Sequence, residues 1–146
     1  MRTVVTLLWT CSVLVLPVAG QEQERPSFSG TWQMDASKSE VHNSKITSAT
    51  WVIEEGDNSI HITQTDNTRN KKIELQCTTD GKECKFPGDR RDSFWYNGPL
   101  LVDMETKNDH VTRYRMKISS DGKTLSVEIT NIVPQGDKMD TLVFQK

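Results

Sequence analysis

The feature that most constrains the fold is a series of short turn sequences between stretches in which apolar and polar residues alternate. Around Asp121-Gly122, a dipeptide that favours a two-residue hairpin turn, the flanking segments acquire a definite register. Their apolar pairs share one face: Ile118 with Leu125, Met116 with Val127, and Tyr114 with Ile129. The other face pairs Arg115 with Glu128, as on an exposed sheet surface. A slip of one residue would turn the apolar set to the solvent, so the pattern predicts this register.

Four further turns predict hairpins of the same kind. Around Asp80-Gly81 we expect Leu75 to pair with Phe86, and around Gly56-Asp57 we expect Ile53 to pair with Ile60 and Trp51 with Ile62. Around Gly136-Asp137 the expected pairs are Phe144 with Ile129 and Leu142 with Asn131. Around a loop at 107–109 they are Val102 with Tyr114 and Leu100 with Met116. Apolar residues dominate these pairs, which indicates a sheet with one buried face.

Many short strands with regularly spaced turns are typical of an all-β barrel or sandwich. We therefore predict a single antiparallel up-and-down β-barrel, or a barrel-like sandwich, of about 8–10 strands. The expected strands are 28–35, 50–55, 59–66, 71–78, 83–86, 92–96, 100–106, 110–118, 124–132 and 139–145. Only 36–44 is a candidate for a helical turn, because it is short and polar and contains Ser37 and Ser39 as possible caps.

Residues 28–34, within the expected opening strand 28–35, alternate strictly between two sides. Phe28, Gly30, Trp32 and Met34 share one side, and polar residues occupy the other, which is the pattern of a strand with one buried face. We predict structural roles for Phe28, Gly30 and Trp32. Trp32 is expected to close one end of the barrel, since large aromatic residues dominate small cores.

The first twenty residues predict export. A positive start at Arg2, an apolar run over 4–18 and small residues at 18–20 form a signal-peptide pattern. The apolar run is too short to span a bilayer, and Gln21 stands where a lipoprotein would need a cysteine. We expect a signal peptide over 1–20, a flexible tail over 21–27, one domain over 28–146, no transmembrane segment after cleavage, and a secreted or periplasmic location.

Cys77 and Cys84 flank the turn predicted at Asp80-Gly81, which would place them opposite each other. Directly opposed strand residues lie about 4.5–5.5 Å apart at Cα, within the range of a disulfide, and export favours oxidation. A thiolate metal site would lack histidine or further cysteine ligands nearby, and the C-x-x-C spacing of redox pairs is absent. We predict a structural disulfide.

Several short motifs resemble those of small exported bacterial proteins of lipocalin-like type, which are β-barrels of the calycin kind. Phe28-Ser29-Gly30-Thr31-Trp32 is similar to the Gly-x-Trp opening strand of lipocalins and to the start of intracellular fatty-acid-binding proteins. Lys38-Ser39, the stretches 95–100 and 119–125, and the Cys77–Cys84 hairpin also look like that group. The resemblance implies a closed or nearly closed barrel whose apolar interior holds a small hydrophobic molecule.

Two departures from these families affect that expectation. Lipocalins commonly carry an arginine near the last strand that packs across the opening Trp, and 139–146 contains none. Fatty-acid-binding proteins often bind a carboxylate with an inward Arg-x-Tyr set, whereas the order here is Arg113-Tyr114-Arg115. If Tyr114 faces inward, both arginines face outward, because adjacent strand residues point to opposite faces. A buried carboxylate clamp is therefore not predicted.

The candidate ligand contacts are Trp51, Trp95, Tyr114 and Met116, in keeping with an apolar pocket that carries a few polar groups. The aromatic run 94–96 cannot face inward as a whole, so at least one of its residues is expected outside the barrel or under a loop.

Catalysis and metal binding are not predicted. The three histidines are scattered without the spacing of a metal site, and no nucleophile elbow or phosphate loop occurs. Glu54, Glu55 and Asp57 crowd a hairpin tip, where carboxylates are usually solvated. The net charge of −2 gives no basic surface for nucleic acid. We expect no enzyme, no cofactor, no metal and no nucleic-acid partner, and a monomer.

Two functions remain open. The first is a carrier that holds a small hydrophobic ligand inside the barrel. The second is a structural or protein-interaction module whose core is filled by its own side chains and whose function lies on its loops. A barrel of about eight strands is compatible with either interior.

Overall fold

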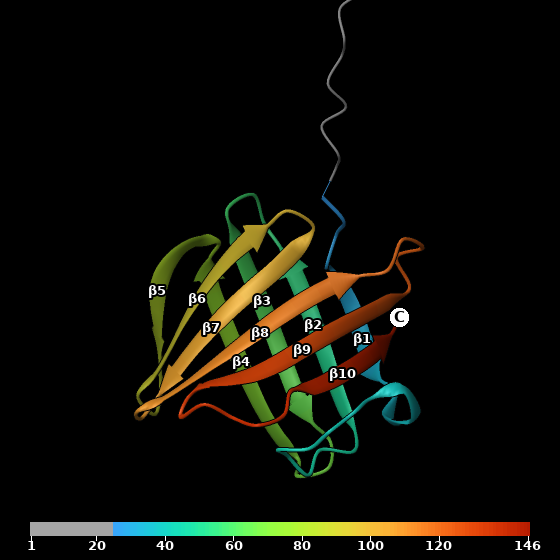
Figure 1. Ribbon diagram of the computed structural model, residues 1–146. Helices are drawn as coiled ribbons and strands as arrows, with labels where there is room; N and C mark the ends of the chain where they lie inside the picture. Colours follow the sequence, from blue (N-terminus) through green and yellow to red (C-terminus); the bar gives the residue numbers. More distant parts are fainter. Residues whose placement is uncertain (1–24) are drawn as a thin grey trace, which may run out of the picture.

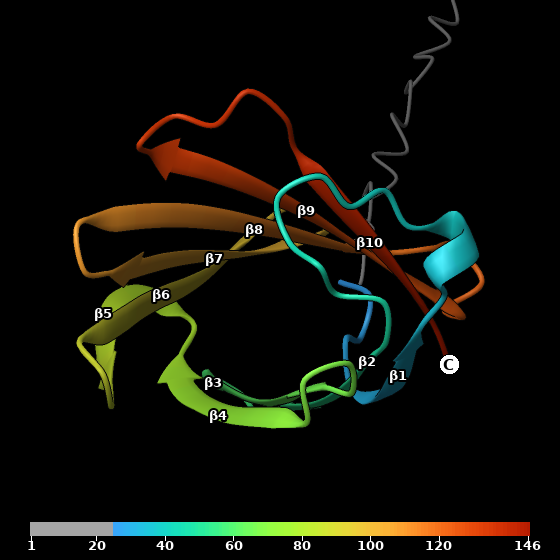
Figure 2. The ribbon, with the colours of Figure 1, turned by 90° about the horizontal axis from the view of Figure 1, so that it is seen from below.

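Ten antiparallel strands follow one another along the chain and form a nearly closed barrel (Figures 1 and 2). The computed structural model describes residues 25–146, so the predicted signal peptide and residues 21–24 of the tail lie outside the described residues. The strands are β1 (Gly30–Met34), β2 (Ala49–Glu55), β3 (Ser59–Asp66), β4 (Lys71–Thr78), β5 (Asp80–Phe86), β6 (Arg90–Asn97), β7 (Leu100–Lys107), β8 (His110–Ile118), β9 (Thr124–Val133) and β10 (Asp140–Gln145). A 3-10 turn, η1 (Ala36–Lys38), lies in the β1–β2 connection. The predicted all-β barrel is confirmed.

The sheet runs in the order β4-β3-β2-β1-β10-β9-β8-β7-β6-β5, so its two edges are β4 and β5. These strands follow each other in the chain but do not form a hydrogen-bonded hairpin, and the predicted pairing of Leu75 with Phe86 is wrong. β5 instead pairs with β6, where Phe86 lies opposite Arg90. The disulfide Cys77–Cys84 is present, with its Cα atoms 5.7 Å apart. It joins the two edges of the open seam across which no strand ladder forms.

The hairpin predicted around Asp121-Gly122 is confirmed in every pair, and Arg115 forms an ion pair of 3.2 Å with Glu128 on the outer face. Two other hairpins have longer connections than predicted. Their observed pairs are Ile53 with Ile62 and Trp51 with Gln64 in β2–β3, and Leu142 with Val127 and Phe144 with Leu125 in β9–β10. In both hairpins the observed register differs from the predicted register by an even number of residues. The apolar side chains therefore keep the predicted inner face.

The β7–β8 hairpin differs by one residue, and this changes which side chains enter the barrel. The turn comprises two residues rather than three, because Lys107 pairs with His110. Tyr114 therefore lies opposite Asp103 rather than Val102. An odd shift inverts the faces of a strand, so the inner face of β7 carries Asp103 where an apolar residue was predicted.

One end of the barrel, which holds the β2–β3, β6–β7 and β8–β9 turns, is filled by its own side chains, and we call it the packed end. Trp32 is fully buried there, and its indole Nε1 donates a hydrogen bond of 2.9 Å to the carbonyl of Phe28. Residues on the inner faces of nine strands and just before β1 share this core. The largest of these fully buried side chains are Phe28, Trp32, Ile53, Ile60, Ile62, Leu75, Phe94, Leu101, Met116, Leu125, Val127 and Phe144.

The segment that leads into β1 is fastened to the packed end by Glu55. This carboxylate accepts hydrogen bonds from the amides of Phe28 and Ser29, at 2.6 and 3.2 Å, and from the hydroxyls of Ser27 and Tyr96, at 2.9 and 2.7 Å. Burial alone would raise the pKa of Glu55, but these donors outweigh it and lower the pKa. The expectation that the acids of this hairpin tip are solvated is therefore wrong for Glu55.

A lysine takes the place beside the opening Trp where lipocalins commonly have an arginine. The Lys146 ammonium lies 5.0 Å from the centroid of the Trp32 ring and donates a hydrogen bond of 2.9 Å to the carbonyl of Ser29. Its side chain crosses Gly30, where an added Cβ would lie 2.5 Å from the Lys146 Cε. Gly30 has φ of 147°, a conformation that L side chains rarely adopt. Both observations explain the glycine in this strand.

Candidate functional site

A cavity of about 770 Å³ lies at the other end of the barrel, which we call the open end. Its wall is built from β2, β3, β4 and β6 to β10, from the β3–β4 and β5–β6 turns, and from the β1–β2 connection. Figure 2 views the barrel from below and shows this connection crossing the end of the barrel. The volume is within the range of about 300–1,000 Å³ that is usual for small-molecule sites.

Part of the wall is apolar. Trp51 stands on β2 with its ring centroid 5.0 Å from that of Phe144, so it separates the cavity from the packed core. The aliphatic wall residues come from β2, β4, β9, β10 and the β1–β2 connection, and Pro87 adds apolar surface from the β5–β6 turn. The aliphatic residues are Ile46, Ala49, Ile73, Ile129 and Leu142. This surface is suited to the hydrocarbon part of a ligand.

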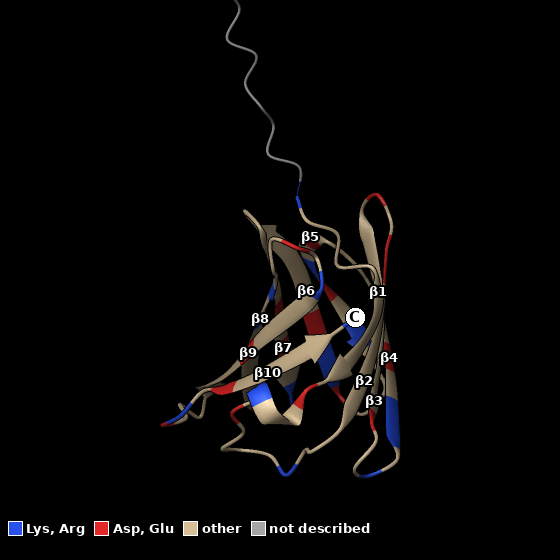
Figure 3. Cartoon of the chain, turned by 90° about the vertical axis from the view of Figure 1, so that its right-hand side faces the viewer, with Lys and Arg blue, Asp and Glu red and all other residues tan. Residues whose placement is uncertain are grey.

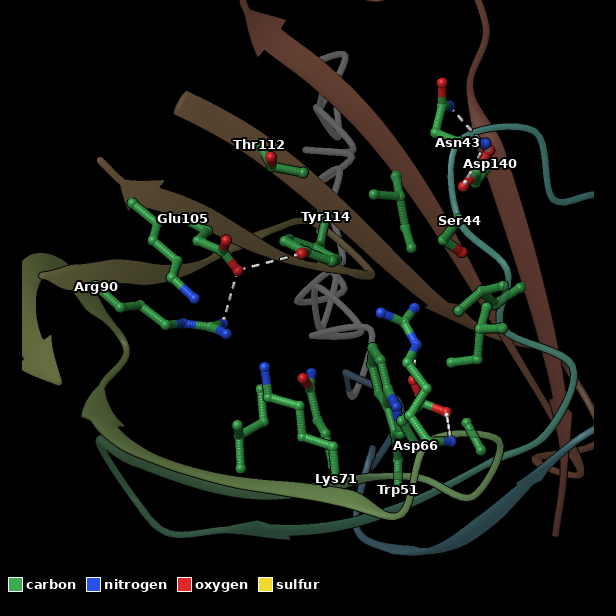
Figure 4. Close-up of a pocket in the computed structure, with 18 of the residues that line it drawn as sticks. Asn43, Ser44, Trp51, Asp66, Lys71, Arg90, Glu105, Thr112, Tyr114 and Asp140 are labelled. Atoms are coloured by element: carbon green, nitrogen blue, oxygen red, sulfur yellow. Dashed lines mark hydrogen bonds and ion pairs between the residues drawn. The ribbon is translucent and has the colours of Figure 1, made fainter. Parts of the chain in front are cut away.

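The β1–β2 connection is held against the cavity by Asp140, which is buried at the start of β10. Its carboxylate accepts hydrogen bonds from the amides of His42 and Asn43, at 2.7 and 3.0 Å, and from the side-chain amide of Asn43, at 2.9 Å (Figure 4). Asn43, Ser44 and Ile46 then line the cavity. Because both backbone amides are bound, this irregular segment is a fixed part of the wall.

The polar part of the wall centres on Arg90, Glu105 and Tyr114, on β6, β7 and β8 (Figure 4). The Arg90 guanidinium makes a two-point contact with the buried carboxylate of Asp92, at 2.8 and 2.6 Å, and lies 3.0 Å from Glu105 Oε2. The Tyr114 hydroxyl donates a hydrogen bond of 3.2 Å to the same Glu105 oxygen.

The environment of this group shifts the pKa of two of its members. Burial acts to lower the pKa of Arg90, but the hydrogen bonds and charge of Asp92, with the charge of Glu105, raise it. Burial and the charge of Glu105 raise the pKa of Tyr114, so its hydroxyl remains a donor at neutral pH. Arg90 is a permanent cation whose charge is matched within the protein.

Asp103, on the inner face of β7, lies opposite Tyr114 and Phe94 in the sheet but does not line the cavity. It is 2% exposed, and its Oδ1 has no hydrogen-bond partner within residues 25–146. Burial and the charge of Asp92 raise the pKa of Asp103 well above its ordinary value. The raised pKa favours the neutral form of Asp103, which lies beside the ion pair of Arg90 with Asp92.

The predicted ligand contacts are only partly brought together. Trp51 and Tyr114 line the cavity. Met116 is buried in the packed core, and Trp95 lies half-buried on the outer face, paired in the sheet with Val102. Of the aromatic run 94–96, Phe94 faces the core, and Tyr96 reaches Glu55 from the same side.

The prediction missed Arg90, Glu105 and Asp103. Arg113 and Arg115 do face outward as expected, and neither lines the cavity. The inward arginine comes instead from the start of β6. The spacing Arg90-x-Asp92-x-Phe94 places all three side chains on one face of a strand, which could have indicated an inward arginine. Charged residues on an inner face, however, run against the usual apolar pattern. The one-residue error in β7 also concealed Asp103 and Glu105.

Residues 25–146 contain no group of three or more His, Cys, Asp or Glu side chains arranged to hold a metal ion. Within the same residues, no helix has the length and apolar character needed to cross a membrane.

Comparison with known proteins gives a likeness of fold. No family model matches the chain, and no curated protein matches its sequence. Solved structures that are similar include fatty-acid-binding protein 1 of Echinococcus granulosus (14% identity, TM-score 0.65, 82% of this chain and 96% of that chain covered), the wild-type fluorescent protein UnaG (17%, 0.62, 82% and 96%), and apo lipid binding protein 8 of Caenorhabditis elegans (14%, 0.60, 82% and 94%). The chain thus has the barrel fold of fatty-acid-binding proteins, which is related to that of lipocalins.

Proposed function

We propose that the protein is an exported carrier that binds a small, largely apolar molecule in the cavity at the open end of its barrel. The observation that supports this is the cavity of about 770 Å³, whose wall combines Trp51 and aliphatic side chains with a few convergent polar groups. The names of the similar structures include fatty-acid and lipid binding. Export rests on the signal-peptide pattern of residues 1–20.

The alternative prediction, a barrel filled by its own side chains, describes only the packed end. At the open end the inner positions of β6, β7 and β8 carry Arg90, Glu105 and Thr112, which line a cavity instead of closing it. We infer that the open end is the binding end and that the packed end gives the barrel its stability.

Native mass spectrometry of protein from an exporting host, before delipidation, is the first test. A bound mass that is lost on denaturation supports a carrier. Titration with the neutral fluorophore N-phenyl-1-naphthylamine then locates the site. Thr112→Trp, on the inner face of β8, would fill part of the cavity and weaken binding by at least about tenfold.

Thr106→Trp, on the outer face of β7, is the matched control and should change the affinity by less than about twofold. Circular dichroism establishes that both variants are folded. Absence of a bound mass together with a failure of the wild-type protein to bind the fluorophore would refute the proposed function. Equal effects of the two substitutions would place the binding site elsewhere.

A further inference from the structure

The polar group of the cavity differs from a free arginine that awaits an anionic ligand. Arg90 already faces two carboxylates, Asp92 through a two-point contact and Glu105 at 3.0 Å. A third carboxylate brought to this guanidinium would meet both of them within a wall that is largely shielded from water, where like charges repel strongly. The cation is therefore poorly placed to attract the head group of a fatty acid.

Glu105 carries the free acceptor of the group. Both of its contacts, with Arg90 and with the Tyr114 hydroxyl, involve Oε2. Within the described part of the chain Oε1 has no hydrogen-bond partner, while Glu105 as a whole lines the cavity. Oε1 is open to the cavity rather than buried without a partner, and as a carboxylate oxygen it can accept a hydrogen bond from a ligand.

The charges around Glu105 favour a donor further. Arg90 is one cation in contact with two carboxylates, those of Asp92 and Glu105, so the group has an excess of negative charge. A ligand hydroxyl can donate to Oε1 in place of water, and a protonated amine also compensates the negative charge.

Cations do occur nearer the solvent. Lys71 begins β4 and Lys107 ends β7, and both are exposed at the rim of the open end. Arg69 is engaged by Asp66 at 3.0 Å. Figure 3 shows basic segments at the open end, which is the lower end in that view. Solvent and salt screen their charge there. Glu105 lies one inward-facing position deeper than Lys107, so it meets the part of the ligand inside the barrel.

We propose that the ligand presents a hydrogen-bond donor, a hydroxyl or a protonated amine, to Oε1 of Glu105, with its apolar part against Trp51, Ile73 and Ile129. This inference rests on the proposed function, because it names the chemistry that the same cavity selects. It distinguishes the cavity from one that recognises a carboxylate through a free arginine.

The test is displacement of N-phenyl-1-naphthylamine by three ligands of equal chain length: decylamine, decanol and decanoate. At neutral pH decylamine should displace the fluorophore at concentrations at least about tenfold lower than decanoate does, with decanol between them. Glu105→Gln keeps the shape but replaces the free carboxylate, and it should reduce the preference for decylamine over decanoate by about tenfold. Glu74→Gln is the control, since it removes an exposed acid from β4 without facing the cavity.

The outcomes separate the two proposals. If decanoate binds as tightly as decylamine, or if Glu105→Gln changes the preference no more than Glu74→Gln does, this inference is overturned and the carrier function stands. If neither the fluorophore nor any of the three ligands binds, the proposed function itself fails. Should Glu105→Gln not fold, Glu105→Asp withdraws the carboxylate by one methylene and must likewise reduce the preference.

Discussion

The two ends of this barrel are made by the same strands but have opposite interiors. On the inner face of β4, Leu75 is fully buried at the packed end, whereas Ile73, two residues earlier, lines the cavity at the open end. On β8, Met116 and Thr112 show the same contrast. Strand alternation decides which residues face inward, but their size and polarity decide whether the interior is filled. One barrel can therefore combine a stabilising core with a site.

The two ends also differ in how they shift the pKa of an inward-facing acid. Glu55, at the packed end, is surrounded by donors, which lower its pKa. Asp103, beside the open end, is buried near Asp92 and within reach of few donors, which raises its pKa. An inward carboxyl group is therefore stabilised as an anion at one end and as a neutral acid at the other.

The largest difference between the ends is expected for truncations on β4. Leu75→Ala creates a cavity in a filled core and should lower the free energy of unfolding by about 2–5 kcal/mol. Ile73→Ala enlarges a space that already exists, so it should cost only about 1 kcal/mol. Urea denaturation measures both. Ile73→Ala should also weaken binding of the fluorophore, and equal destabilisation by the two variants would remove the distinction between packed and open ends.

The second largest effect is expected from removal of the disulfide, which joins β4 and β5 across the seam. Cys77→Ala combined with Cys84→Ala should lower the free energy of unfolding by about 2–3 kcal/mol, because the unfolded chain is no longer cross-linked. The affinity for the fluorophore should change by less than about threefold. Intact mass with and without alkylation checks the starting state, and two reactive thiols in exported wild-type protein would contradict the predicted staple.

A smaller effect is expected at Glu55. Glu55→Gln weakens the hydrogen bonds from the Ser27–Ser29 segment and should cost about 1 kcal/mol at neutral pH. Because the folded-state pKa is lowered, this stability is present above the ordinary value of 4.5 and is lost as the pH falls through the folded pKa. The wild-type advantage should therefore disappear in acid. Glu54→Gln, on the outer side of the same strand, is the control, and an advantage that persists in acid would argue against the assigned role.

Asp103 should show a dependence of stability on pH that is opposite in sign to that of Glu55. Its folded-state pKa is raised, so its contribution is fully present below the ordinary value of 3.8 and is lost as the pH rises through the folded pKa. Asp103→Asn imitates the neutral acid and should gain stability relative to the wild type over a pH range that begins at the ordinary value of 3.8. Unfolding curves at several pH values test this, with the exposed Asp137→Asn as control. A constant difference across that range would mean that Asp103 is ionised.

The sequence predicted most of the barrel because turn residues and alternation are local signals. Asp121-Gly122 set the β8–β9 register correctly, and even shifts in β2–β3 and β9–β10 left the inner faces unchanged. The candidate site was predicted less well. Trp51 and Tyr114 line the cavity, but Arg90 and Glu105 were missed. Glu105 was missed because a one-residue difference in the β7–β8 turn exchanges the two faces of β7. Arg90, on β6, was missed because a charged residue on an inner face runs against the usual apolar pattern.

The sequence by itself determined the all-β class, the direction in which most side chains point, and the pairing of Cys77 with Cys84. Only the tertiary structure decided that β4 and β5 are edges, that Glu55 binds the incoming segment, and that Arg90, Glu105 and Tyr114 meet. These features depend on how distant strands close on one another, and alternation along a single strand carries no information about the residues across the barrel.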